Sequence, residues 1–155
     1  IWALRRPPEM AKVAAEAGVP VVLQHNRPME MAEYGDVMGE IIQELRESID
    51  IARQAGVKDE QVILDPGIGF GKRLEHNLEV MRRLDELVAL GYPVLVGTSR
   101  KSLIGQTLQL PVHDRLEGTA ATVALAIAKG CHIVRVHDVK EMVRVSRMMD
   151  AMLKS

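Results

Sequence analysis

Short apolar runs alternate along the chain with longer segments in which apolar residues recur every three or four positions. The short runs are aliphatic and rich in β-branched residues, and each ends in glycine or polar residues, as buried parallel strands do. They cover residues 19–23, 62–64, 93–96 and 133–136. This pattern predicts four strands of a parallel sheet.

The longer segments predict five helices. Asp36 can cap the start of a helix whose apolar positions run through 38–52, and Gly56 stands where a left-handed residue can end it. The other four predicted helices cover residues 8–17, 78–88, 119–129 and 139–153. Helices and strands therefore alternate, with roughly 30 to 40 residues between strands, which is enough for helical crossovers.

Two architectures fit this order: a doubly wound open sheet, or part of an eight-fold (β/α) barrel. A complete barrel needs about 250 residues, whereas the chain has 155. Four strands would therefore make half a barrel. The length predicts a single domain that spans residues 1–155.

The composition narrows the class of protein. Hydrophobic residues make up 47%, charged residues 26%, and the net charge is −1, so there is no electrostatic case for binding nucleic acid. No apolar run approaches the ~20 residues of a membrane helix, so no membrane association is expected. The single Cys131 rules out an internal disulfide and fits a cytoplasmic location. Because the chain begins at Ile1 and not at Met, we expect it to be a piece of something longer.

Polar residues follow all four predicted strands. In both architectures ligands bind at the carboxyl ends of parallel strands, so this edge is the predicted binding site. The residues there are Gln24, His25, Asn26 and Arg27, then Asp65, then Gly97 to Ser102, and finally Arg135, His137 and Asp138.

The glycines that follow the second strand do not make a phosphate-binding loop. Gly67, Gly69 and Gly71 are spaced too closely for the dinucleotide fingerprint. Lys72 is followed by Arg73, where a Walker loop requires Ser or Thr. We interpret the glycines as a turn into the next helix.

Asp65 has two interpretations that the sequence leaves open. A carboxylate directly after a buried strand needs hydrogen-bond donors. It could accept two parallel hydrogen bonds from an amino-and-ring-NH edge, such as that of a pterin or guanine. It could equally cap its own turn before Pro66.

Arg135 and His137 lie two positions apart on the fourth strand, so their side chains share a face. Lys101 comes from the end of the neighbouring strand. If these are the last two strands of a barrel, the three residues are placed for a phosphate or diphosphate. The alternative for Arg135 is an ion pair within the barrel, because a buried Arg needs an anionic partner in any case.

Four motifs in order resemble those of bacterial dihydropteroate synthases. They are LDPGIGFGK at 64–72, YPVLVGTSRKSLIG at 92–105, RLEGTAAT at 115–122 and VRVHDVKE at 134–141. The resemblance covers essentially the whole chain. It implies the α/β fold of the pterin-binding family, a (β/α)8 TIM barrel. This chain would be its second half, with helix four and strands and helices five to eight.

The resemblance also implies an activity. The family enzymes are transferases of folate biosynthesis and sulfonamide targets. They join 6-hydroxymethyl-7,8-dihydropterin diphosphate to p-aminobenzoate, giving 7,8-dihydropteroate and diphosphate with the help of Mg²⁺. The C–O bond is thought to break before the aniline nitrogen attacks. The family further implies a cytoplasmic homodimer, whose interface we expect on the last helices, where Met148, Met149 and Met152 lie.

The resemblance assigns roles residue by residue. Asp65 would bind the amino group and ring NH of the pterin, Lys101 its other edge, and Gly97 would leave room for the flat ring. The full pterin-binding set would be Asp65, Gly97, Lys101, Phe70, Gln24 and Val22.

The other substrates fall to further residues. Ser102 and Phe70 would contact p-aminobenzoate, while Arg135 and His137 would hold the diphosphate. Lys101, Arg135 and His137 would form the catalytic set. No metal ligand is assigned in this chain, because the family's ligand would lie upstream.

Two departures from the family pattern stand out. Gln24 replaces the Met of the family's L-M-H-N sequence, which leaves its role open. The first loop, the Asp of strand three and an Asn would all lie upstream of Ile1, so we expect no synthase activity from the 155-residue chain alone. The alternatives are a non-catalytic pterin-binding module and a pterin-binding methyltransferase that uses methyltetrahydrofolate and a corrinoid partner. Against the latter stand the sequences 99–102 and 135–137.

Overall fold

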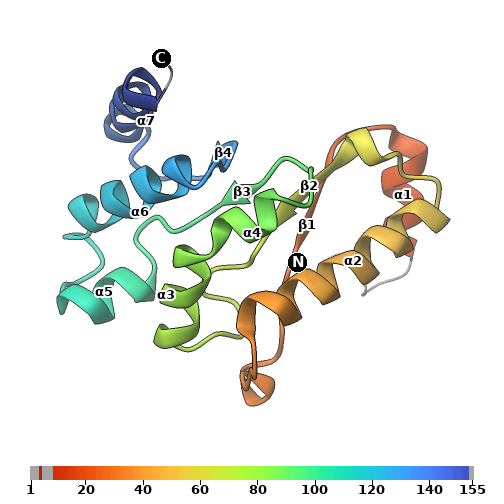
Figure 1. Ribbon diagram of the computed structural model, residues 1–155, viewed down its shortest axis with the longest axis horizontal. Coiled ribbons are helices and arrows are strands. Elements are labelled where there is room, and N and C mark those ends of the chain that lie inside the picture. Colours follow the sequence, from red (N-terminus) through yellow and green to blue (C-terminus); the bar gives the residue numbers. More distant parts are fainter. Residues whose placement is uncertain (1–3, 5–8, 154–155) are drawn as a thin grey trace.

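A row of four parallel strands with helical crossovers makes up the chain, as seen in the computed structural model, which describes residue 4 and residues 9–153 (Figure 1). The strands are β1 (Val21–Gln24), β2 (Val62–Asp65), β3 (Leu95–Val96) and β4 (Ile133–Val134). β1 pairs with β2 and β3 with β4, and a bridge between Leu64 and Val94 joins the two pairs. The strands therefore lie side by side in the order in which they occur in the sequence.

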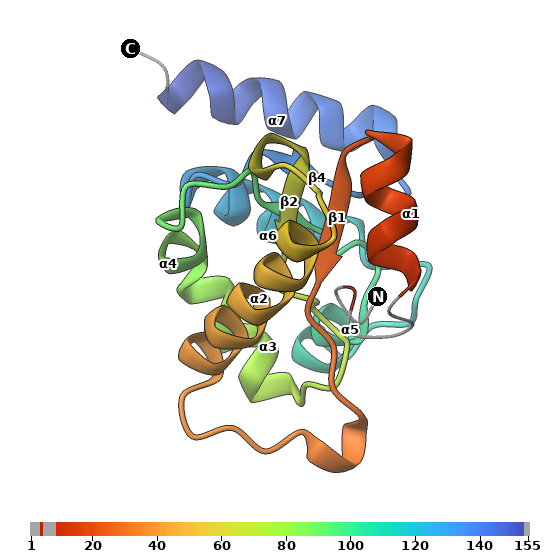
Figure 2. The ribbon, with the colours of Figure 1, turned by 90° about the vertical axis from the view of Figure 1, so that its right-hand side faces the viewer.

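Seven helices precede, connect or follow the strands in the part of the chain that the structure describes. They are α1 (Glu9–Ala17), α2 (Val37–Gln54), α3 (Leu74–Arg82), α4 (Leu84–Val88), α5 (Ser102–Leu108), α6 (Leu116–Ala128) and α7 (Val139–Leu153), with short 3-10 turns η2 (Met29–Met31) and η3 (Asp59–Gln61). Helices α1 and α2 flank β1 and β2 (Figure 2), and α7 lies at the opposite end of the row from α2 (Figure 1). None of the helices within residues 9–153 is long and apolar enough to span a membrane.

The predicted long helix is confirmed as α2. The side chain of Asp36 caps it by accepting a 3.2 Å hydrogen bond from the backbone N–H of Gly39, and Gly56 follows its end with φ +95°. The apolar residues that recur along it are all buried: Met38, Ile41, Leu45, Ile49 and Ala52. They form one core with Leu23 of β1 and Leu64 of β2, both fully buried.

Two local predictions were wrong. The single helix predicted over 78–88 is two helices, α3 and α4, which are separated at Arg83. The Arg83 guanidinium binds Asp36 at 2.7 Å and Glu79 at 2.8 Å, so contacts across the fold coincide with the break. Helix α5 was not predicted, because its two turns bury only a short apolar run that includes Leu103 and Ile104.

The strand order decides between the two architectures. A doubly wound sheet reverses its strand order at a switch point, whereas a (β/α) barrel keeps neighbours in sequence. Here the order is β1, β2, β3, β4 without reversal. The chain is therefore an α/β structure with the topology of a partial barrel.

Replacing Leu45 by Ala tests the core that α2 forms. This side chain is fully buried, so its truncation leaves a cavity, and the free energy of unfolding should fall by about 2–5 kcal/mol. Urea denaturation measures the change. Leu153→Ala, at a site 53% exposed on α7, is the control and should stay within about 0.5 kcal/mol of the parent. An equal loss in both variants would contradict the proposed core.

Candidate functional site

Asp65 and Gln24 meet at the carboxyl ends of β2 and β1, where the parallel register pairs them. Asp65 is 5% exposed. Its Oδ1 accepts a 2.7 Å hydrogen bond from the Gly67 N–H, and its Oδ2 accepts a 3.0 Å hydrogen bond from Gln24 Nε2. Burial raises the pKa of Asp65, and the two hydrogen bonds offset part of that effect. The carboxylate therefore does cap its own turn, and its remaining lone pairs can still accept from a ligand.

Gln24, which stands where the family has Met, has a polar role here, because its amide holds the carboxylate of Asp65. Since Nε2 faces Asp65, the orientation of the amide follows from this hydrogen bond. Its Oε1 is buried, and no donor reaches it from the part of the chain that the structure describes. Val22 lies two positions earlier on the same face of β1 and is 39% exposed.

Lys101 reaches from the segment after β3 toward the glycine loop that follows β2. Its Nζ donates a 2.6 Å hydrogen bond to the Ile68 carbonyl and lies 4.8 Å from the centre of the Phe70 ring. Burial lowers the pKa of Lys101, and the nearby Asp65 partly offsets this. The carboxylate, the ammonium group and the aromatic ring thus belong to one region of the strand ends.

A small hollow of about 90 Å³ opens beside Lys101 at the ends of β3 and β4. It is lined by Gly97, Ser99, Lys101, Arg135, Val136 and His137. A Cβ on Gly97 would come no closer than 3.8 Å to a neighbouring side chain, so packing does not demand glycine here. Its lack of a side chain instead leaves the surface beside Lys101 flat.

Arg135 and His137 follow the end of β4, and both are exposed while Val134 and Val136 are half-buried. This alternation agrees with the predicted shared face, although the strand itself ends at Val134. Across the described residues, none of the ion pairs includes Arg135. The interpretation of Arg135 as one half of an ion pair within the barrel thus has no support here.

Ser99 belongs to the predicted strand-end segment 97–102, but the sequence indicated no role for it. Its Oγ accepts a 3.1 Å hydrogen bond from the backbone N–H of His137 and lies 2.8 Å from Nδ1 of the same residue. Either Ser99 Oγ or His137 Nδ1 can be the donor of this contact, depending on the tautomer of the ring. In both cases the two contacts with Ser99 hold the imidazole at the hollow.

Arg100 and Ser102 belong to the same segment but do not line the hollow. Arg100 has φ +57° and pairs with Asp138, its Nε lying 3.1 Å from Oδ2. Ser102 is the exposed first residue of α5 and does not line the hollow. Of the predicted substrate-contacting residues, Gly97, Lys101, Arg135 and His137 line the hollow, whereas Ser102, Asp65, Gln24, Val22 and Phe70 do not.

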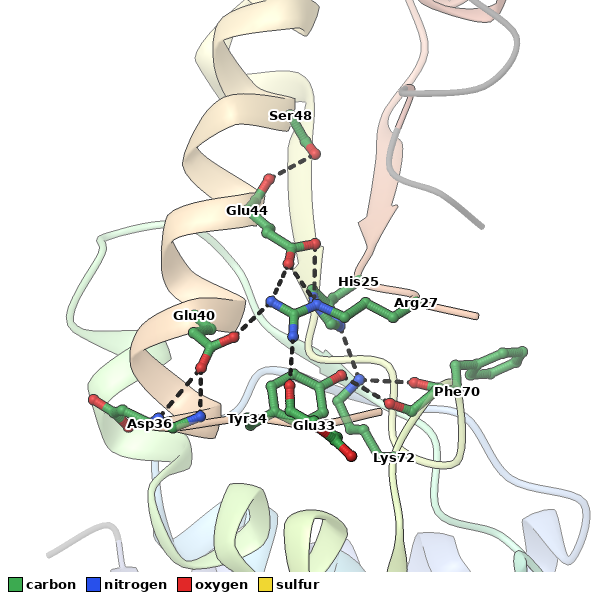
Figure 3. A network of polar contacts seen from close by, with 12 residues as sticks. His25, Arg27, Glu33, Tyr34, Asp36, Glu40, Glu44, Ser48, Phe70 and Lys72 are labelled. Atoms are coloured by element: carbon green, nitrogen blue, oxygen red, sulfur yellow. Dashed lines mark hydrogen bonds and ion pairs between the residues drawn. The ribbon is translucent and has the colours of Figure 1, made fainter. Parts of the chain in front are cut away.

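Lys72 anchors a buried polar network that the sequence also failed to reveal (Figure 3). It is 5% exposed, and its Nζ lies 2.8 Å from His25 Nδ1 while donating to the carbonyls of Gly67 at 3.1 Å and Phe70 at 3.0 Å. His25 Nε2 lies 3.3 Å from a carboxylate oxygen of Glu44 on α2. The only signal in the sequence was a Lys directly after three spaced glycines, and that pattern matched neither of the two phosphate-loop motifs.

Burial sets the charges in this network. It lowers the pKa of Lys72 to about 7 and that of His25 to about 4. Arg27 completes the network by donating to Glu44 at 2.6 Å and to Glu40 at 2.7 Å. His25 is therefore neutral at pH 7, while Lys72 lies near the midpoint of its titration.

The site does not by itself provide a magnesium site. Mg²⁺ prefers several oxygen ligands in octahedral geometry. Within residues 4 and 9–153, no three His, Cys, Asp or Glu side chains are grouped in a way that could hold a metal ion. At the strand ends the carboxylates of Asp65 and Asp138 are already engaged, the first by Gln24 and Gly67 and the second by Arg100.

Comparison with known proteins gives one family. The sequence pattern of the family described as pterin binding enzyme matches residues 1–137. The dihydropteroate synthase of Bacillus subtilis is 54% identical over 153 residues, covering 99% of this chain and 53% of the relative. The chain thus spans about half the length of the curated relatives it matches.

Solved structures of dihydropteroate synthases share the fold. The protein from Clostridium difficile in the presence of pteroic acid has a TM-score of 0.96 and 47% identity, covering 100% of this chain and 59% of that one. The protein from Thermus thermophilus in complex with 4-aminobenzoate has a TM-score of 0.90 and 41% identity, covering 97% of this chain and 60% of that one.

Gly67→Ala tests how tightly the loop after Asp65 is packed. Gly67 has φ +70°, and a Cβ there would lie 1.9 Å from the His25 carbonyl oxygen. Gly91, with φ +84° and nothing within 4 Å, is the matched control. Left-handed strain should cost both variants about 1–2 kcal/mol of unfolding free energy, and the clash should cost Gly67→Ala about 1–3 kcal/mol more. Denaturant midpoints measure the difference, and equal losses would contradict the close approach.

Proposed function

The chain belongs to the pterin-binding enzyme family, and on this premise we propose that it is the second half of the (β/α)8 barrel of a dihydropteroate synthase. Residues 1–155 would form one unit of that barrel, holding helix four and strands and helices five to eight. Two observations support this: the four strands keep sequential parallel order, and the chain covers 53% of the Bacillus subtilis relative. The proposed substrates are 6-hydroxymethyl-7,8-dihydropterin diphosphate and p-aminobenzoate.

The proposal depends chiefly on one observation. A buried carboxylate, Asp65, and an ammonium group, Lys101, lie at adjacent strand ends beside the hollow lined by Arg135 and His137. A pterin presents an amino group and a ring NH on one edge and acceptors on another. Asp65 would accept from the first edge, and Lys101 would donate to the second.

The rest of the pterin pocket would surround the flat ring. Gly97 leaves an open surface beside Lys101, and Phe70 offers an aromatic face. Val22 would contribute apolar contact. Gln24 would act indirectly, because its amide holds Oδ2 of Asp65 in place.

The diphosphate would bind at the hollow. Arg135 offers a guanidinium without an ion-pair partner among the described residues, and Ser99 holds the His137 ring beside it. When the C–O bond of the pterin methylene breaks, the electron pair leaves on the diphosphate, and these groups with Lys101 would stabilise the growing negative charge. The aniline nitrogen of p-aminobenzoate then forms the new C–N bond and releases a proton. Ser102 and Phe70 would contact that substrate.

Several further predictions stay open. The fold family implies Mg²⁺, and because the described residues do not form its site, no step is assigned to it. A homodimer through the last helices remains a prediction, to which the exposure of Met148 and Met152, 59% each, is relevant. A cytoplasmic location, a role in folate biosynthesis and sulfonamide inhibition likewise follow only from the proposed activity.

Asp65→Asn tests pterin recognition. The amide loses the charge and one acceptor oxygen, so the dissociation constant for 6-hydroxymethylpterin should rise about tenfold or more, as expected for a hydrogen bond to a charged group. Isothermal calorimetry on the 155-residue chain measures it. The control is Asp85→Asn, which removes a surface ion pair with Lys129 and should leave the affinity unchanged. Equal affinities for the parent and Asp65→Asn would contradict the assignment.

A turnover assay tests whether the 155-residue chain is active on its own. The 155-residue chain should bind the pterin and yield no dihydropteroate when p-aminobenzoate and the pterin diphosphate are supplied, because the family's first loop is expected upstream. A chromatographic assay for dihydropteroate measures this. Product formation by the purified chain would contradict the expectation. A non-catalytic pterin-binding module remains the second candidate, because it too would bind the pterin without turnover.

A further inference from the structure

We propose that Lys72 is a positioning residue that, in its protonated form, latches the loop 66–71 in the shape that presents Asp65 and Phe70 to the pterin. This inference rests on the proposed function for its ligand. The latch itself rests on the contacts of Lys72 within the fold. Lys72 does not line the hollow, so it would act through the residues that it holds.

The geometry around Lys72 calls for three donors. Its Nζ faces three acceptors, the carbonyls of Gly67 and Phe70 and the Nδ1 of His25, at 2.8 to 3.1 Å. An ammonium group carries three N–H bonds, whereas a neutral amine carries two. When His25 Nδ1 acts as an acceptor, only the protonated side chain can therefore satisfy all three contacts at once.

The state of His25 supports this assignment. If Nδ1 accepts from Lys72, the neutral ring carries its proton on Nε2, which lies 3.3 Å from a Glu44 carboxylate oxygen but outside hydrogen-bond geometry. The other tautomer would bring the lone pair of Nε2 close to the negative charge of Glu44, which is unfavourable. Glu44 in turn is held by Arg27 at 2.6 Å. The charge of Glu44 therefore favours the tautomer in which Nδ1 accepts from Lys72.

The latch acts on both proposed ligand contacts. The Gly67 residue whose carbonyl binds Lys72 also donates its N–H to Asp65 at 2.7 Å. The Phe70 carbonyl faces Lys72, while its ring points away from the network (Figure 3). A change at one buried nitrogen would therefore move the loop at Asp65 and at the aromatic ring together.

Other contacts also hold the loop, and one of them shares the Gly67 carbonyl, which accepts a 3.0 Å hydrogen bond from the Phe70 N–H. Asn77 accepts from the Gly69 N–H at 2.8 Å, Tyr34 donates to the Gly71 carbonyl at 2.8 Å, and Lys101 donates to the Ile68 carbonyl. The loop would thus loosen locally without unfolding when Lys72 loses its proton.

The titratable and charged groups that face Lys72 influence the pH range over which it loses its proton. They are His25 after β1, Arg27 in the segment beyond it, Glu44 on α2, Asp65 on β2 and Lys101 after β3. Burial, the largest effect, lowers the pKa of Lys72 to about 7. With its pKa near 4, His25 stays neutral from pH 6 to 9. The latch should therefore be closed at pH 6 and open progressively above pH 7.

Affinity and stability should respond to pH in opposite directions. The unfolded chain holds the Lys72 proton up to its usual pKa of 10.5, and the folded chain loses it near 7. Between these values the unfolded state binds more protons, so this group's contribution to the unfolding free energy rises with pH. If Lys72 were only structural, pterin binding would not weaken over the pH range in which the fold becomes more stable.

Lys72→Met provides the decisive comparison, with Lys140→Met, an exposed lysine of α7, as the matched control. At pH 6 the affinity of Lys72→Met for 6-hydroxymethylpterin should be about tenfold weaker than that of the parent, the effect of losing hydrogen bonds from a charged donor. The ratio of the two dissociation constants, that of Lys72→Met over that of the parent, should fall toward one by pH 9. Because both proteins bind the same ligand, this ratio cancels any titration of the pterin itself. A ratio that stays constant from pH 6 to 9, or that equals one at pH 6, would overturn the proposal.

The ligand-free parent gives a second test, which holds even if Lys72→Met fails to fold. The backbone amide resonance of Phe70 should titrate with a midpoint near pH 7 in NMR spectra, and this transition should be absent from any folded Lys72 variant. No such midpoint between pH 6 and 9 would overturn the latch even if the chain binds pterin. A clear midpoint in a chain that binds no pterin at any pH would support the latch and overturn the proposed function alone.

Discussion

The parallel register that sets Gln24 opposite Asp65 is the constraint on which the candidate site depends. It brings an amide donor within 3.0 Å of a buried carboxylate and fixes the point where β2 turns away. A shift of one residue would turn Gln24 to the other face of its strand and leave Asp65 with only its own turn as a partner. Leu23 and Leu64, fully buried beside these two residues, hold that register by packing into the core.

Buried charge is the second organising factor. Lys72 and Asp65 are each 5% exposed, and taking either from water is costly unless polar groups surround it. The fold meets that requirement with carbonyl groups of the glycine loop, a neutral imidazole and a backbone N–H. The glycines are needed because this arrangement brings backbone against backbone: a Cβ on Gly71 would lie 2.1 Å from the carbonyl oxygen of Arg27.

Much of this architecture could be predicted from the sequence. Hydrophobic periodicity predicted α2 with its Asp36 cap, and the rule that ligands bind at strand ends selected Lys101, Arg135 and His137, which do line one hollow. The network around Lys72 could not be predicted, because its partner His25 lies 47 positions away and no local pattern reports such a contact.

The limits of local patterns recur elsewhere in the fold. The break at Arg83 coincides with an ion pair to Asp36, the residue that caps α2. The left-handed backbone of Arg100, at φ +57°, is supported by a hydrogen bond from its N–H to Thr119 and by an ion pair with Asp138. Each depends on residues that only the folded chain brings together.

The 2.6 Å hydrogen bond from Lys101 to the Ile68 carbonyl has a consequence for any ligand. That bond uses one of the three N–H groups of the ammonium, so two remain for a ligand. The backbone also fixes where Nζ lies before any ligand arrives. An acceptor that binds there would meet a donor whose long side chain is already ordered, so little further side-chain entropy would be lost.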